Sequence, residues 1–84
     1  MFRVEFSSRA KREFDRLNEK KVEDALKVLM IDPLPARCYD VKKLKGLSDT
    51  FRIRIGKIRI VYTIIWKDRI VLISRISSRE NIYD

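Results

Sequence analysis

Three segments of the chain alternate apolar residues with polar or charged ones, a pattern that predicts β-strands. They are FRVEF (Phe2 to Phe6), FRIRIGKIRIVY (Phe51 to Tyr62) and RIVLISRISS (Arg69 to Ser78). The middle segment is interrupted by Gly56-Lys57, and glycine in the first place of a two-residue loop favours a type II′ hairpin turn. The sequence therefore predicts four strands, the second and third of which form a hairpin.

Two segments that follow the first strand have the periodicity of amphipathic helices. Ser7 or Ser8 offers an N-cap to the first helix, and Pro33 ends the second, which leaves residues 32–40 as an irregular connection. The apolar residues that share a helix face are Ala10, Phe14 and Leu17 in the first segment and Val22, Leu26, Leu29 and Met30 in the second.

The predicted order is β-α-α-β-β-β, which indicates an α+β fold. Two short helices joined by a tight link form a helical hairpin, and a three-stranded antiparallel meander joins the first strand in one mainly antiparallel sheet. The chain of 84 residues shows no internal repeat and no linker composition. We therefore expect a single domain over residues 1–84.

The hairpin places Arg54 directly opposite Arg59, although like charges facing each other across a strand pair are destabilising. Because side chains alternate between the faces of a sheet, Arg52, Arg54 and Arg59 share one face. The opposite face, which we expect to pack on the helices, carries Phe51, Ile53, Ile55, Ile58, Ile60 and Tyr62. The sequence thus predicts a sheet with one buried face and one cationic face.

The register of the last strand has two alternatives. A three-residue turn pairs Arg75 with Val61 on the cationic face, whereas a two-residue turn sets Arg75 opposite Ile60 on the core face, where a charge is costly. We prefer the first for that reason. It predicts Leu72 and Ile76 on the core face, and Val71 and Ile73 beside Thr63 and Ile65 on the other.

The net charge of +8 is concentrated in the second half of the chain. Residues 1–41 carry nine Lys/Arg and eight Asp/Glu, whereas residues 42–84 carry eleven and four. Between Lys42 and Lys67 there are eight Lys/Arg and a single acid, Asp49. A solvated basic surface would be expected to mix both signs, so this cluster favours a polyanionic partner such as nucleic acid.

The composition also excludes several kinds of chemistry. The chain has one cysteine and no histidine, so it lacks internal disulfides, Ser-His and Cys-His pairs and histidine-based zinc sites. We expect no metal and no cofactor, and any catalysis must use carboxylates, Tyr, Lys or Arg. No stretch approaches the roughly 20 apolar residues that span a bilayer, and the N-terminus lacks a signal-peptide core. We therefore expect a cytoplasmic protein without membrane association.

The segments KKLKG, FRIRIGKIRIVY, the following strand and the terminal SSRENIYD resemble the RelE/ParE toxin superfamily of type II toxin–antitoxin systems. The resemblance covers essentially the whole chain. It implies one of two activities: RelE-like members are mRNA interferases that cleave mRNA in the ribosomal A site, and ParE-like members inhibit DNA gyrase. It also implies an acidic RelB-like antitoxin, and contact with operator DNA only through the antitoxin complex.

For a RelE-like member, the resemblance implies a metal-independent endoribonuclease in which the RNA 2′-hydroxyl attacks the adjacent phosphate. The implied catalytic residues are Arg54, Arg59, Arg79 and Tyr83. The implied RNA-binding residues are Lys43, Lys45 and Arg52, joined by Arg75 from the cationic face. We expect this activity rather than the two alternatives, gyrase inhibition and nucleic-acid binding without catalysis, because Arg79 and Tyr83 have no role in either.

The chain departs from the family pattern at the first hairpin strand. Some members carry lysine there, and a lysine with a depressed pKa can act as a base. Both Arg52 and Arg54 stay protonated and make poor bases. The resemblance therefore leaves Tyr83 and Glu80 as the two candidate proton acceptors.

Overall fold

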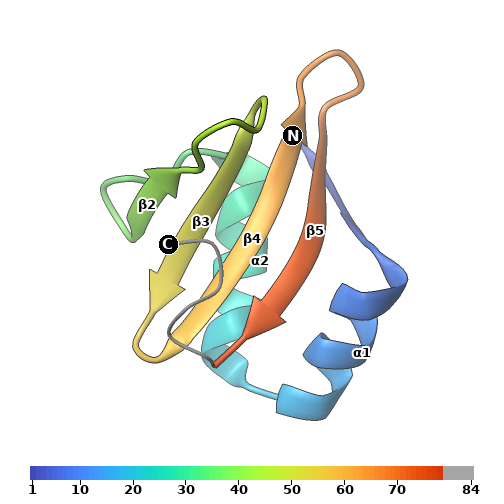
Figure 1. Cartoon of the computed structure of the whole chain (residues 1–84), viewed down its shortest axis with the longest axis vertical. Coiled ribbons are helices and arrows are strands. Elements are labelled where there is room, and N and C mark those ends of the chain that lie inside the picture. The colour runs from blue at the N-terminus through green and yellow to red at the C-terminus, as the bar shows by residue number, and fades with distance from the viewer. Residues whose placement is uncertain (79–84) are drawn as a thin grey trace.

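The computed structural model describes residues 1–78 and has the predicted α+β architecture (Figure 1). The predicted elements are all present, and one further strand, β2, precedes the hairpin. The elements are β1 (Arg3–Phe6), α1 (Ser8–Leu17), α2 (Lys20–Ile31), β2 (Asp40–Lys43), β3 (Thr50–Ile55), β4 (Ile58–Ile65) and β5 (Ile70–Ser77).

All five strands belong to one sheet with the order β1-β5-β4-β3-β2. Strands β2 to β5 form an antiparallel meander, and β1 pairs in parallel with β5. Helix α2 lies behind the sheet, and α1 lies beside the end of β5 (Figure 1). We call the sheet face turned away from α2 the open face.

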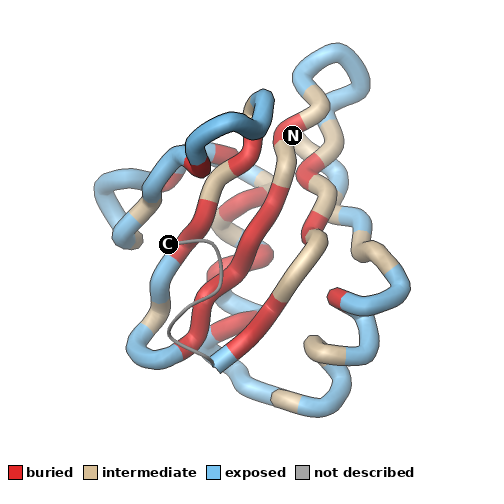
Figure 2. Tube along the Cα trace, in the orientation of Figure 1, coloured by how far each residue is buried: buried red, intermediate tan, exposed pale blue. Residues whose placement is uncertain are grey.

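The core lies between the sheet and the helices (Figure 2). Ser7 begins α1 as predicted, because its Oγ accepts a hydrogen bond from the Ala10 amide at 3.1 Å. Asn18 ends that helix in the left-handed conformation, with φ 46°. The core comprises Ala10, Val22, Ala25, Leu26 and Leu29 from the helices and Ile53, Ile58, Ile60, Tyr62, Ile64, Val71, Ile73 and Ile76 from the sheet.

The β3–β4 hairpin confirms the predicted register at every pair, including Arg54 with Arg59. Gly56 has a positive φ of 60°, as the first position of a type II′ turn requires. Ile53 and Ile60 are fully buried in the core, which confirms the predicted core face. The opposite face carries the arginines as predicted, but it is not exposed throughout, since Arg52, Arg59 and Val61 are also buried.

The β4–β5 pair confirms Arg75 opposite Val61 but corrects the turn and three side-chain positions. The loop has four residues, since Ile65 pairs with Ile70. The register then shifts between Val61 and Tyr62, where Ser74 is the extra residue of a β-bulge. Ahead of this bulge the faces are the reverse of those predicted: Val71 and Ile73 are fully buried in the core, and Leu72 is not part of it.

Strand β2 lies within a segment that the sequence pattern left without a strand. Its four residues, DVKK, include one apolar side chain, Val41, so they give no alternation signal. The preceding connection is anchored by Tyr62, whose buried hydroxyl donates to the Pro33 carbonyl at 2.7 Å. Burial raises the pKa of the Tyr62 hydroxyl, which therefore remains a neutral donor.

Neither helix in the described part of the chain is long and apolar enough to cross a membrane.

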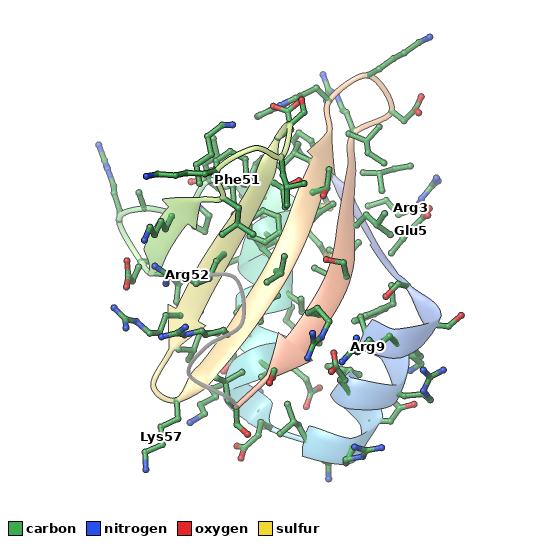
Figure 3. All side chains as sticks on the ribbon, viewed as in Figure 1. Arg3, Glu5, Arg9, Phe51, Arg52 and Lys57 are labelled. Atoms are coloured by element: carbon green, nitrogen blue, oxygen red, sulfur yellow. The ribbon has the colours of Figure 1, made fainter. Side chains whose placement is uncertain are left out.

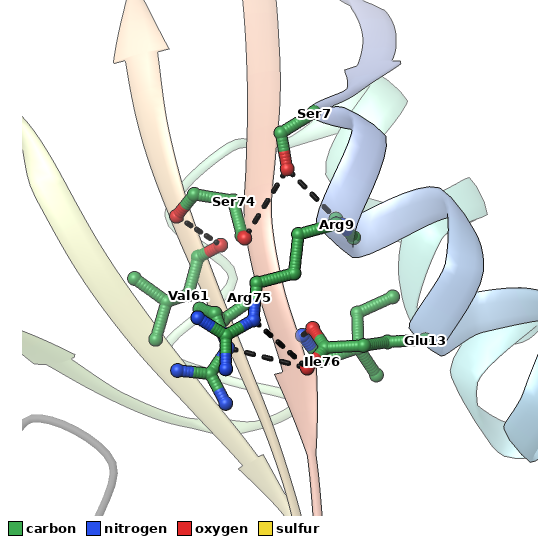
Figure 4. Close-up of polar contacts among 8 residues, drawn as sticks. Ser7, Arg9, Glu13, Val61, Ser74, Arg75 and Ile76 are labelled. Atoms are coloured by element: carbon green, nitrogen blue, oxygen red, sulfur yellow. Dashed lines mark hydrogen bonds and ion pairs between the residues drawn. The ribbon is translucent and has the colours of Figure 1, made fainter.

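On the edge of β5 that faces away from β4, the second half of the strand is held by side chains of α1 and its N-cap (Figure 4). β1 pairs with residues 70–73 only. Beyond them, Glu13 Oε1 accepts a hydrogen bond from the Ile76 amide at 2.7 Å, and Glu13 Oε2 accepts one from Arg75 Nε at 3.2 Å. The Ser7 hydroxyl donates to the Ser74 carbonyl at 3.2 Å. These contacts satisfy backbone groups that an edge strand would otherwise present to another chain.

We expect Glu13→Ala to lower the free energy of unfolding by about 2 kcal/mol. The substitution removes a partly buried acceptor and leaves the Ile76 amide and Arg75 without it. Urea denaturation measures the change. Asp15→Ala is the matched control, since its ion pair with Lys11 is exposed and worth less than about 0.5 kcal/mol. Equal losses in the two variants would contradict a structural role for Glu13.

Candidate functional site

The open face of the hairpin gathers four basic residues, which we call the arginine face: Arg52, Arg54, Lys57 and Arg59. Arg52 and Arg54 come from β3 and Arg59 from β4, with Lys57 in the turn between them (Figure 3). Arg54 and Arg59 line a cavity of about 270 Å³ at the turn, together with Gly56 and Lys57. Three cationic side chains thus surround a space large enough for an anionic group.

The arginine face is held firmly by the sheet. Arg52 is 5% exposed and Arg59 is 7% exposed, which is rare for arginine. Arg54 is more accessible, with 48% of its side chain exposed. Charges that are fixed and partly desolvated act more strongly on a bound anion than mobile surface charges do.

Asp40 places one carboxylate among these arginines. Its Oδ2 accepts hydrogen bonds from Arg54 Nε at 3.1 Å and Nη2 at 2.8 Å, and it lies 3.5 Å from Arg52 Nη1. The sequence interpretation found only Asp49 as a compensating acid, because Asp40 lay in a segment not recognised as a strand. The pairing of β2 with β3 brings Asp40 opposite Arg54.

The hydrogen bond from Arg54 lowers the pKa of the Asp40 carboxyl, and the positive charge of Arg52 adds to this effect. Asp40 therefore stays ionised as the pH falls below the usual range for aspartate, and the ion pair is lost only when the pH falls through the lowered pKa.

We expect Arg54→Gln to raise the pKa of Asp40 towards its ordinary value, because the charge-assisted hydrogen bonds disappear. A carbon-detected NMR titration of the Asp40 side-chain carboxyl measures the change. Arg12→Gln, which removes the same charge from an exposed position of α1, should leave that titration unaltered. An unchanged pKa in the Arg54 variant would mean that the contact does not persist in solution.

The structure brings together some of the predicted site residues and separates others. Lys43 pairs with Phe51 on the helix side of the sheet, and its Nζ donates to the Leu47 carbonyl at 3.4 Å. Lys42 instead pairs with Arg52 and shares its face. Lys45 is exposed in the β2–β3 connection. Arg75 belongs to the open face but turns to Glu13, next to α1.

Three residues implied by the family resemblance, Arg79, Glu80 and Tyr83, lie outside the described residues. The sequence pattern does not identify one member of the arginine face, Lys57, which it predicts only as a turn residue, although its place beside Gly56 puts it between the two hairpin arginines. Lys42, which shares the face of Arg52, cannot be assigned to a face without the register of β2.

Comparison with known proteins places this fold, with arginines clustered on the central hairpin, among the small toxins of type II toxin–antitoxin systems. The model of the ParE toxin of the type II toxin–antitoxin system parDE matches residues 4–83. The chain therefore belongs to the RelE/ParE toxin superfamily, as the sequence resemblance predicted.

Named relatives agree with this assignment. "Putative toxin RelE1" of Methanocaldococcus jannaschii is 39% identical over 85 residues, which cover 98% of this chain and 94% of the relative. Among solved structures, the archaeal RelE–RelB complex of Pyrococcus horikoshii matches 96% of this chain and 98% of its own, with a TM-score of 0.79 and 26% identity. The intact Escherichia coli RelBE complex shares the fold, with a TM-score of 0.79 over 96% of this chain and all of its own at 20% identity.

Proposed function

We propose that this toxin is a ribosome-dependent, metal-independent endoribonuclease that cleaves mRNA in the A site and thereby inhibits translation. The observation that carries the proposal is the pair Arg54 and Arg59, which face each other around a cavity at the hairpin turn. The two like charges repel each other, and Asp40 offsets part of this at Arg54. An anion bound in the cavity would be stabilised by both arginines. A phosphodiester of RNA has a negative charge and two non-bridging oxygens, which suit the planar guanidinium of arginine.

The reaction would begin with attack of a 2′-hydroxyl on the adjacent phosphorus, which forms a phosphorane. The bond from phosphorus to the 5′-oxygen of the next nucleotide would then break, leaving a 2′,3′-cyclic phosphate and, after protonation, a 5′-hydroxyl. The intermediate phosphorane carries more negative charge than the starting phosphodiester. Arg54, Lys57 and Arg59 would stabilise that charge as it develops, and their fixed positions mean that little reorganisation is needed. This chemistry can proceed without a metal or a histidine.

The proton of the attacking hydroxyl needs an acceptor other than Asp40. The lowered pKa of Asp40 makes it a weak base, and its hydrogen bonds to Arg54 occupy the oxygen nearest the site. Tyr83 and Glu80 are the candidates that the resemblance supplies. In the same way, Arg79 would hold the phosphate and assist the leaving oxygen.

We also propose an acidic RelB-like antitoxin as the neutralising partner. Two similar solved structures, from Pyrococcus horikoshii and Mycobacterium tuberculosis, are RelE–RelB or RelBE2 complexes, each 26% identical to this chain. Asp40 illustrates how a carboxylate engages Arg54. An antitoxin carboxylate placed on the arginine face would exclude RNA phosphate in the same manner, and the complex would supply any operator DNA contact.

The test is primer extension on a defined mRNA in programmed ribosomes, with and without the purified protein. The proposal predicts discrete cuts within A-site codons, and it predicts that these cuts are absent from free mRNA. Intact mRNA at protein concentrations that saturate the ribosome would overturn it.

Inhibition of DNA gyrase is the second candidate, because the matching family model is that of the ParE toxin. This activity would need a protein-binding surface and no nuclease chemistry. A supercoiling assay with purified gyrase distinguishes the two: loss of supercoiling with intact ribosomal mRNA supports the ParE-like activity. Salt-sensitive RNA binding without either effect would indicate a binding domain alone.

A further inference from the structure

A second basic cavity lies between α1 and β5, at the side of the sheet. We call it the α1–β5 cleft. It has a volume of about 250 Å³ and is open to solvent. Its polar lining residues are Arg9, Glu13, Arg16, Arg75, Ser77 and Ser78. Neither the arginine face nor the chemistry proposed above uses this cleft.

The charges in the cleft converge on one carboxylate. Arg75 Nε lies 3.2 Å from Glu13 Oε2, and Arg9 Nε lies 3.6 Å from the same oxygen (Figure 4). The other oxygen of Glu13 accepts the Ile76 amide. Arg16 also lines the cleft, so three arginines share it with a single carboxylate whose two oxygens are both engaged.

This arrangement differs from the other ion pairs of the helices. Lys11 with Asp15 and Lys20 with Asp24 are one-to-one pairs at i,i+4 spacing, the ordinary pattern of a solvated helix face. The cleft instead combines cations from α1 and from β5. Each guanidinium has five N–H donors, and the contacts of Arg9 and Arg75 with Glu13 are made through Nε, so the planar fork of each side chain has donors in addition to the one that contacts Glu13.

The cleft is continuous with the arginine face. Ser77 lines the cleft and pairs across the sheet with Arg59, while Arg75 pairs with Val61, two residues further along β4. Paired residues on neighbouring strands are about 5 Å apart. A nucleic-acid strand whose phosphate lies at Arg59 would therefore need to extend by little more than the width of one strand to reach the cleft.

We propose that the α1–β5 cleft is a phosphate subsite for the RNA strand that the arginine face binds. Arg9, Arg16 and Arg75 supply the charge, and the hydroxyls of Ser77 and Ser78 add neutral donors. Glu13 orients the two guanidinium groups that contact it. The subsite rests on the proposed function, because it assumes that RNA is the bound polyanion. It serves to position the strand, and no bond is made or broken there.

The test is fluorescence anisotropy of a 5′-labelled single-stranded RNA 15-mer, measured over a series of KCl concentrations. The test variant is Arg9→Gln with Arg16→Gln. The control is Arg12→Gln with Lys27→Gln, which removes two charges from exposed helix positions outside the cleft. A third variant, Arg54→Gln, reports independently on the arginine face.

The slope of log K against log[KCl] is negative, and loss of one phosphate contact should make it shallower by about 0.7. If the variant and the wild type bind equally at 1 M KCl, this change makes the variant bind roughly fourfold more weakly than the wild type at 0.15 M. We expect this change in the cleft variant and a clearly smaller one in the control. The Arg75 Nε–Hε signal in NMR should also shift when the 15-mer is added to the wild-type protein. That second measurement does not depend on the stability of any variant.

Equal slopes in the cleft variant and the control, together with an unmoved Arg75 signal, would overturn the subsite. If Arg54→Gln still weakened binding in that case, RNA binding by the arginine face would stand without the cleft. If the cleft variant weakened binding and Arg54→Gln did not, the subsite would stand and the proposed catalytic position would fail. A wild-type protein that does not bind the 15-mer would overturn both.

Discussion

Replacing Arg59 with leucine is expected to lower the rate of A-site mRNA cleavage by about 10²- to 10³-fold, the usual cost of losing one preorganised donor to a developing anion. Arg59 lies opposite Arg54, lines the cavity at the turn and is 7% exposed, so its charge is brought to the cavity from a buried position in β4. Single-turnover primer extension with saturating toxin measures the chemical step.

The same variant should remain folded, which separates a catalytic loss from a structural one. A leucine side chain suits this buried position, and the change removes a like-charge pair across the strands. Circular dichroism and urea denaturation provide that check. Arg12→Leu, on the exposed side of α1, should cleave at the wild-type rate. A folded Arg59→Leu protein with wild-type cleavage would show that the phosphate lies elsewhere.

The hairpin could be predicted from sequence because the information that fixes it is local. Gly56 determines the turn, the turn determines the pairing, and the pairing then places Arg54 opposite Arg59. Alternation of apolar and charged residues assigned each side chain to its face. For the same reason, the central part of the candidate site could be predicted before the structure was known.

The remainder depends on contacts between distant parts of the chain. Asp40 meets Arg54 only because β2 pairs with β3, and Glu13 meets Arg75 across a sequence separation of 62 residues. The bulge at Ser74 reverses the faces of β5 relative to a regular strand, and no turn residue marks it. A one-residue shift of this kind moves every later side chain to the other face, so an apparently small error in the turn misplaced Val71 and Ile73.

The family assignment does not by itself decide the target. The matching family model describes a ParE toxin, whereas the similar curated relative and solved structures carry RelE names. A shared fold hosts different activities, which must be argued from the site. The proposal of RNA as the target rests on the arginine face, where Arg54, Lys57 and Arg59 line one cavity.

The largest effect on stability is expected from Ile60→Ala. Ile60 is fully buried at the centre of β4, and truncating such a side chain costs about 2–5 kcal/mol through lost burial and the cavity left behind. A chain of 84 residues has a total stability of about 4–13 kcal/mol at ordinary values per residue. The melting temperature should therefore fall by at least about 10 °C, as measured by thermal circular dichroism.

Ile65→Ala is the matched control, because it removes the same atoms from the same strand on the open face. Ile65 is only partly buried, so we expect a loss of about 1 kcal/mol. The difference between the two variants measures how strongly β4 distinguishes its core face from its open face. Similar losses would mean that the open face is packed as tightly as the core, which would argue against its being the surface that receives RNA.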